Sequence, residues 1–164
     1  DLTPAIFLDT AGLGYEEEGE EGTGSWSNPQ EAKRVVRELD KILKAGVRPA
    51  DIAIISPYSA QVKLLTGMMM GDSQDPGEIR ELEIDSVDAF QGREKEVVIV
   101  SLVRSNSEGE VGFLADTRRM NVAITRAKRK LILVGDSAIL CRLPFYDDLL
   151  KYMETVGGYQ SAWE

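Results

Sequence analysis

The chain has 164 residues, of which 43% are hydrophobic and 29% charged, so it fits one globular domain with its own core and excludes wholesale disorder. The sequence contains no histidine and one cysteine, which excludes His-based triads, His-ligated metal sites and an internal disulfide bond. The net charge of −9 on its own disfavours nucleic acid as a partner, because phosphates repel an acidic surface.

Strand and helix signals alternate from the start of the chain. The apolar residues 6–8 predict a short buried strand, and the glycine- and glutamate-rich segment of about 14–27 predicts a mobile, solvated acidic loop. Asn28-Pro29-Gln30-Glu31 predicts a helix start, with Asn28 as the cap and Glu31 completing a capping box. Apolar residues then recur at helical spacing as far as Leu43, and Gly46 marks the end of this helix.

Three further strands and a second helix are predicted in the middle of the chain. Residues 52–55 are a buried strand, and an amphipathic helix follows from about residue 60 to 68. Leu82, Ile84 and Val87 alternate as in a strand. The β-branched run 97–103 is typical of a central strand covered on both faces.

The last part of the chain continues the alternation. Helical spacing returns at Met120, Ala123, Ile124 and Ala127, residues 131–134 are another buried strand, and a final helix covers about 144–156. The tail after Gly158 is expected to fray. We therefore predict one α/β domain over residues 1–164, with three layers and a mostly parallel sheet covered by helices on both faces.

Parallel sheets of this kind bind ligands beyond the carboxyl ends of their strands. The polar residues that follow the predicted strands are therefore the first candidates for a site. They are Asp9 and Thr10, Ser56 to Tyr58, Arg104 to Asn106, and Gly135 with Asp136.

Three segments carry groups that suit phosphate chemistry. In the segment 85–94, Gly92 permits an unusual turn, and the neighbouring hydroxyl, amide, guanidinium and carboxylate groups could bind a phosphate or a ribose. Arg119 and Arg126 lie seven residues apart, about two turns along one predicted helix, and arginine matches phosphate oxygens. Tyr58, after Pro57, could stack or hydrogen-bond at a strand end. Taken singly, each segment also fits an ordinary polar turn, a solvated basic helix face or a common strand end.

In their order and spacing, these segments resemble motifs IV, V and VI of the superfamily-one helicases. The matching phrases are Ser56-Pro57-Tyr58 with Gln61, the run from Ser86 to Glu94, and Arg119 with Asn121-Val122-Ala123 and Thr125-Arg126-Ala127. The resemblance extends over about the whole chain, includes 9–12 and 104–114, and is greatest to the up-frameshift and immunoglobulin-mu-binding-protein branch.

This resemblance implies a RecA-like (P-loop NTPase-like) domain, the second and C-terminal one of an ATP-dependent DNA or RNA helicase that moves 5′ to 3′. It implies that ATP and Mg²⁺ are held mainly by a first RecA-like domain of the same parent chain, and that single-stranded nucleic acid crosses the top of both domains. Arg126 matches the arginine finger, which offsets charge during phosphoryl transfer.

The resemblance also assigns roles to individual residues. The nucleotide-binding residues would be Gln61, Gly92, Arg93, Glu94 and Arg126. The nucleic-acid-binding residues would be Ser56, Pro57, Tyr58, Ser86, Val87, Asp88, Arg104 and Asn106, and the residues that couple the two sites would be Gln91, Arg119 and Asn121. Val62 departs from the pattern, because some relatives carry a phosphate-binding arginine at this position.

No Walker A sequence, G-x-x-x-x-G-K-[ST], and no acidic magnesium-binding strand end is found in the chain. We therefore predict that the fragment is monomeric and by itself neither hydrolyses ATP nor unwinds a duplex. The alternative is a non-catalytic RecA-like module that only binds nucleic acid or protein. A phospho-acceptor receiver is disfavoured, because Asp9 stands without a second acidic neighbour.

Membrane and secretory signals are missing from the chain. No apolar run approaches the roughly 20 residues of a membrane-spanning helix, and the first residues do not resemble a signal peptide. We expect no membrane partner and an intracellular protein, nuclear or cytoplasmic, in which the lone Cys141 meets a reducing environment. Because the first residue is Asp1 and not methionine, we also expect a piece of a longer protein.

Overall fold

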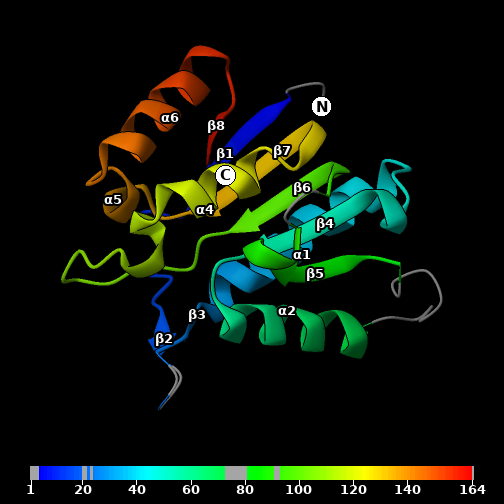
Figure 1. The fold of residues 1–164 in the computed structure, drawn as a ribbon, viewed down its shortest axis with the longest axis horizontal. Helices are drawn as coiled ribbons and strands as arrows, with labels where there is room; N and C mark the ends of the chain where they lie inside the picture. The colour runs from blue at the N-terminus through cyan, green and yellow to red at the C-terminus, as the bar shows by residue number, and fades with distance from the viewer. Residues whose placement is uncertain (1–3, 20–21, 23, 73–80, 91–92, 164) are drawn as a thin grey trace.

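The computed structural model describes residues 4–19, 22, 24–72, 81–90 and 93–163, and its main feature is one six-stranded sheet (Figure 1). The strand order is β5-β4-β6-β7-β1-β8, and every neighbouring pair is parallel. The strands are β1 (Ala5–Asp9), β4 (Ile52–Ser56), β5 (Glu83–Ser86), β6 (Lys95–Ser101), β7 (Ala127–Gly135) and β8 (Tyr159–Ser161). A separate antiparallel pair joins β2 (Glu18–Gly19) to β3 (Trp26–Ser27).

Helices cover both faces of the sheet, which gives the predicted three layers (Figure 1). On one face lie α1 (Pro29–Lys44) and α2 (Ser59–Asp72). On the other lie α4 (Thr117–Ile124), α5 (Ser137–Leu140) and α6 (Pro144–Thr155). Short 3-10 helices occur at η1 (Pro49–Asp51), η2 (Val87–Phe90) and η3 (Gly112–Ala115).

The central strands are apolar on both sides because each side packs against a helical layer. In β1, Ile6 and Leu8 pack toward α1, whereas Phe7 between them packs toward α6. All five residues of β4 are buried, as are the last five of β6 and of β7. This double burial explains the near-continuous apolar runs in the sequence.

The C-terminal tail does not fray after Gly158, contrary to the sequence prediction. β8 pairs in parallel with β1, and Tyr159 donates a 2.5 Å hydrogen bond to the Asp9 carboxylate. The three residues of β8 are too few and too polar to carry a strand signal of their own. Their pairing is set by β1 and not by local propensity.

The structure confirms Asn28 as the cap of α1, but the predicted capping box is wrong. Asn28 accepts a 3.1 Å hydrogen bond from the Glu31 backbone N–H, as a cap does. The Glu31 side chain does not return to Asn28, because it accepts from Ser101 Oγ at 2.6 Å and from Val103 N at 2.8 Å. The backbone N–H of Asn28 donates instead to Gln61 Oε1 at 2.9 Å.

The helix that carries the basic motif is shorter than predicted. α4 ends at Ile124, and Ala127 already belongs to β7. Thr125 Oγ1 donates to the carbonyls of Asn121 and Val122 at 2.9 and 3.1 Å, which ends the helix with a local side-chain hydrogen bond. Arg119 and Arg126 therefore do not lie two turns apart on one helix.

Candidate nucleotide and nucleic-acid site

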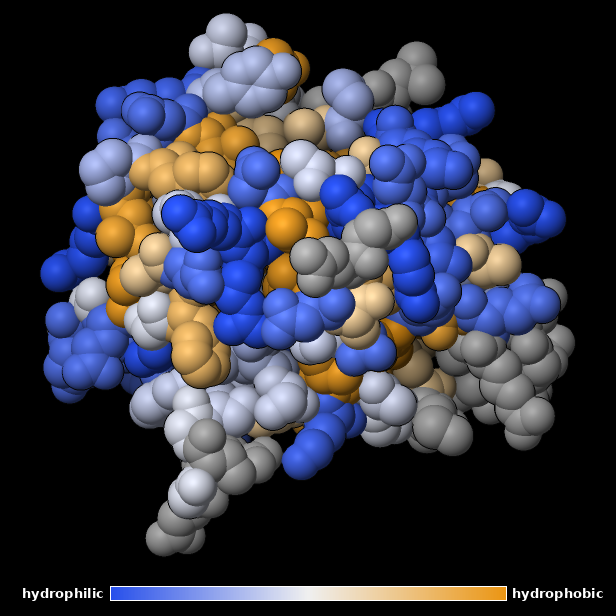
Figure 2. Space-filling model, in the orientation of Figure 1, coloured by the Kyte–Doolittle hydropathy of each residue, from blue (hydrophilic) through white to orange (hydrophobic). Residues whose placement is uncertain are grey.

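The carboxyl ends of the parallel strands meet at one edge of the sheet, where Ser56, Ser86 and Arg104 lie at or just beyond their strands. The residues Arg93, Glu94 and Arg126 precede β6 and β7 and therefore lie at the opposite, amino-terminal edge. Figure 2 shows the viewed face as largely hydrophilic, with smaller apolar patches between the charged side chains. No group of His, Cys, Asp or Glu in the described part of the chain is arranged to hold a metal ion.

Arg126 lies at the junction between α4 and β7. Its backbone carbonyl accepts from Lys95 N at 2.9 Å, which holds it beside the start of β6. Its Nη2 donates to Thr125 Oγ1 at 3.3 Å, whereas its buried Nε has no hydrogen-bond partner among the described residues. A buried donor without an acceptor is rare in a folded protein, so this guanidinium is the most conspicuous unsatisfied group of the site.

Arg93 and Glu94 lie next to Arg126, because they directly precede Lys95. The Arg93 side chain is half exposed, forms an ion pair with Glu83 of β5 and lies 4.8 Å from the centre of the Phe90 ring. Glu94 is exposed. The structure therefore places Arg93 and Glu94, at the end of motif V, close to Arg126. Gln91 and Gly92 lie outside the described residues.

An ion pair joins the other parts of motifs V and VI. Arg119 Nη2 lies 2.5 Å from Asp88 Oδ2, which connects α4 to η2. Asn121 is exposed on α4, and Ser86 is partly buried at the end of β5. These residues remain accessible to a ligand or to a neighbouring domain.

Several other predicted ligand contacts are buried in the domain. Ser56, Pro57, Tyr58, Gln61 and Val87 are all buried. Gln61, for example, is fully buried and donates to Asn28 O at 3.3 Å and to Ser101 Oγ at 3.0 Å. In this arrangement they hold the strand ends and loops in place and present little side-chain surface to a ligand.

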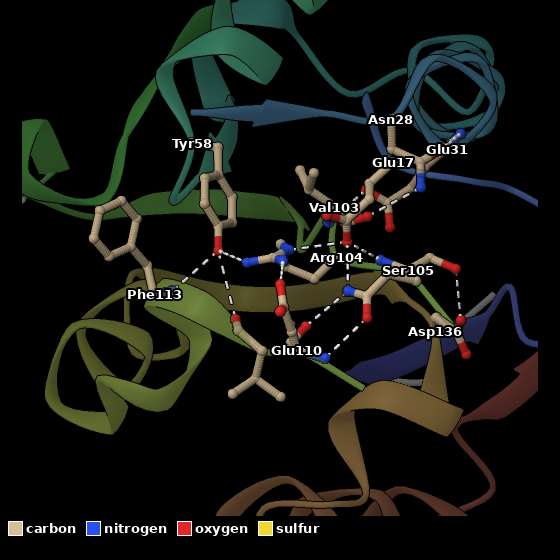
Figure 3. Close-up of polar contacts among 12 residues, drawn as sticks. Glu17, Asn28, Glu31, Tyr58, Val103, Arg104, Ser105, Glu110, Phe113 and Asp136 are labelled. Carbon is tan, nitrogen blue, oxygen red and sulfur yellow. Dashed lines mark hydrogen bonds and ion pairs between the residues drawn. The ribbon is translucent and has the colours of Figure 1, made fainter. Parts of the chain in front are cut away.

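Arg104 is likewise buried, and its guanidinium is engaged within the domain (Figure 3). Its Nε donates to Glu17 Oε1 at 2.9 Å, its Nη2 lies 3.6 Å from Glu110 Oε2, and its plane lies 4.6 Å from the centre of the Trp26 ring. Glu17 also accepts from the Asn106 amide at 2.7 Å. The geometry therefore favours a structural role for Arg104 and Asn106 over direct phosphate contact.

Glu17 also corrects the prediction of a wholly solvated acidic loop. Its side chain is only 5% exposed, whereas Glu16 and Glu18 beside it are exposed. A groove of about 490 Å³ opens beside Glu17, and its lining includes Glu16, Glu108, Glu110 and Asp136. Because these carboxylates repel phosphate, the groove does not suit the nucleic-acid backbone.

Sequence reasoning did not predict the backbone turn at Val103, just after β6. Val103 adopts a left-handed backbone conformation with φ of 72°, which is unusual for a β-branched residue. Two residues of the α1 start hold it there: Glu31 accepts from its N–H, and Asn28 Nδ2 donates to its carbonyl at 3.0 Å. Burial raises the pKa of Glu31 to about 8. Only the polar character of residues 28 and 31 in a helix start hinted at these contacts.

A protein-family model described as an AAA domain matches residues 1–138. The chain belongs to this AAA domain family. Sequence relatives of this AAA domain include the DNA-binding protein SMUBP-2 of Mesocricetus auratus, which is 45% identical over 98% of the chain. They also include a regulator of nonsense transcripts 1 homolog of Neurospora crassa, which is 42% identical over 93% of the chain. The chain spans only 16% and 14% of the length of these two proteins.

A solved structure supports the fold of this AAA domain. It is described as the C-terminal domain of a possible DNA helicase from Lactobacillus plantarum WCFS1, and it has a TM-score of 0.57 at 16% identity over 98% of this chain and 85% of that chain. The RecA-like α/β fold is thus confirmed, and the resemblance to the up-frameshift and immunoglobulin-mu-binding-protein branch is confirmed by the relatives. Within the described residues, no helix is both long and apolar enough to cross a bilayer.

Proposed function

We propose that this AAA domain is the C-terminal RecA-like half of an ATP-dependent helicase, and that Arg126 is its arginine finger. The observation that carries the proposal is the position of Arg126, which is partly exposed and lies beside the exposed end of motif V. Its terminal Nη groups, rather than the buried Nε, would donate to a phosphate oxygen of a nucleotide in an interdomain cleft. The residues present therefore fit a nucleotide that reaches the domain from outside.

When bound, ATP and Mg²⁺ would supply the phosphoryl group and the metal charge, held mainly by the N-terminal RecA-like domain of the parent chain. Arg126 would place a fixed positive charge where negative charge develops during phosphoryl transfer, an effect worth about 10³–10⁵ in rate in related systems. Arg93, Glu94 and Gly92 would border the nucleotide from the motif V side. The buried Gln61 would act indirectly, by positioning the α1 start.

Coupling to nucleic acid would run through η2 and α4. The Asp88–Arg119 ion pair links these two elements. Gln91 lies three residues after Asp88 in the sequence, and Asn121 two residues after Arg119. A single strand of DNA or RNA would cross the carboxyl edge of the sheet near Ser86 and Asp88, in the 5′ to 3′ direction of the helicase branch. The protein would act in the nucleus or cytoplasm, and the isolated monomeric domain would be inactive.

The test is Arg126→Ala in the full-length protein. We expect ATP turnover to fall by about 10³-fold or more, with nucleotide affinity largely kept, because a finger acts on the transition state more than on the ground state. Arg129→Ala is the matched control, because Arg129 is exposed on β7 and pairs with Glu96 at 2.8 Å. Turnover near wild type in Arg126→Ala would reject the finger, whereas a wild-type full-length protein without ATP turnover would favour the non-catalytic binding module.

A further inference from the structure

Phe113 is an exposed aromatic ring at the site edge, and neither the predicted site nor the proposed mechanism uses it. It lies in η3, and half of its surface (50%) is accessible, whereas Phe7 and Phe90 are fully buried. One side of the ring packs on Tyr58, with the ring centres 5.5 Å apart and the planes tilted by 30° (Figure 3). The guanidinium of Arg119 lies 5.7 Å from the ring centre.

The exposed ring is held firmly in place. The Phe113 N–H donates to Tyr58 Oη at 3.0 Å, and its carbonyl accepts from Asp116 N at 3.0 Å. The next residue, Leu114, is fully buried in the core beneath α4 and α6. These contacts fix the backbone of Phe113 at the surface, and the packing of the ring on Tyr58 favours the orientation observed.

We propose that Phe113 stacks on an unpaired nucleobase of the bound single strand. An aromatic face fixed at a surface is the feature on which single-strand-binding proteins stack bases, and every base offers a matching face. Arg119 places a cation over the ring, 5.7 Å from its centre, and connects it through Asp88 to motif V. This inference rests on the proposed function, because it requires that the domain binds single strands.

The charge distribution around Phe113 favours stacking over phosphate contact. Glu108, Glu110 and Asp116 are charged groups in or beside the same loop, and Arg104 beneath it is already neutralised by Glu17. These carboxylates repel the strand backbone, whereas stacking requires no net positive charge. A strand is therefore expected to contact this place through a base, with its phosphates turned away.

The test is strand affinity of the full-length protein and its Phe113 variants, measured by fluorescence anisotropy with a labelled oligothymidylate. We expect Phe113→Ala to bind about 5- to 150-fold more weakly, the range that loss of one stacked base gives. Its dependence on salt concentration is expected to stay unchanged, because no phosphate contact is lost. Phe113→Tyr keeps the ring and is expected to bind like wild type. Tyr152→Ala, which removes an exposed ring from α6, is the matched control and is expected to change nothing.

An oligonucleotide series with one abasic site at successive positions locates the contact. Wild type is expected to lose affinity at one position, and Phe113→Ala is expected to be insensitive at that same position. Equal affinities of wild type and Phe113→Ala would overturn the inference alone, whereas a wild-type protein that binds no single strand would overturn the proposed function as well. Unchanged strand affinity with altered strand-independent ATP turnover would identify Phe113 as a contact to a neighbouring domain and also overturn the inference.

Discussion

Asp88 and Arg119, which are 31 residues apart, form a 2.5 Å ion pair that joins η2 to α4. The two side chains are 68% and 33% exposed, so solvent screens much of their attraction. The pair therefore connects two motifs without contributing much to the stability of the fold.

Asp88→Asn is expected to separate coupling from stability. The free energy of unfolding is expected to change by less than about 1 kcal/mol, the usual worth of an exposed pair. In the full-length protein, stimulation of ATP turnover by a single strand is expected to fall, while unstimulated turnover is kept. Chemical denaturation and ATPase assays with and without an oligonucleotide measure these two effects, and full stimulation in the variant would show that the pair carries no coupling.

The Arg104–Glu17 pair is expected to behave in the opposite way, because both side chains are buried, at 4% and 5% exposure. Glu17→Ala leaves the Arg104 charge without its main partner and is expected to cost about 3–5 kcal/mol of folding free energy. Glu16→Ala changes an exposed neighbour of the same kind and is expected to stay within about 0.5 kcal/mol of wild type. Urea denaturation measures both, and equal effects would mean that Arg104 is not held by Glu17.

Glu31 is expected to make the stability of the domain depend on pH. Burial raises its pKa in the folded protein to about 8, well above its value in the unfolded chain, about 4.3. Between these values the folded state holds a proton that the unfolded state has lost, so stability falls as the pH rises through this range. Thermal unfolding between pH 5 and 8, roughly this window, is expected to show a steeper decline for wild type than for Glu31→Gln, which does not ionise. Parallel profiles would contradict the assignment.

Two glycines are expected to respond oppositely to alanine. At Gly158 an added Cβ would lie 2.0 Å from the Ala5 carbonyl oxygen, so Gly158→Ala must push β8 away from β1 and destabilise the domain. At Gly67 in α2 an added Cβ meets no atom within 4 Å, and Gly67→Ala is expected to stabilise by about 0.5–1 kcal/mol, through helix propensity. Melting temperatures of the two variants check the pair, and a stabilised Gly158→Ala would contradict the close approach of these strands.

The sequence predicted the layers of the fold because burial on both faces leaves apolar runs that a reader can recognise. It failed at the end of α4, where Ala127 continued the helical spacing although it belongs to β7. Ala127 packs against the same core as Met120 and Ala123. Its apolar side chain therefore fitted the helical spacing, although the residue begins a strand. The local signal for the true end, the Thr125 hydroxyl, was present but common.

The site was predictable as a set of segments but not as a set of contacts. The order of the motifs indicated Arg126 and the neighbourhood of Arg93, which the structure brings together. It could not show that Arg104 and Gln61 turn inward, because burial depends on the partners Glu17, Asn28 and Ser101 from distant parts of the chain. In an acidic run such as 16–18, nothing distinguishes the one buried glutamate from the exposed ones.

The backbone turn at Val103 ties the first helix to the loop that carries Phe113. The Val103 N–H donates to the Glu31 carboxylate, and the Val103 carbonyl accepts from the Asn28 side chain at the start of α1. These hydrogen bonds couple the direction of the chain after β6 to the orientation of α1. A small rotation of α1 about its axis would therefore shift the loop that follows residue 103.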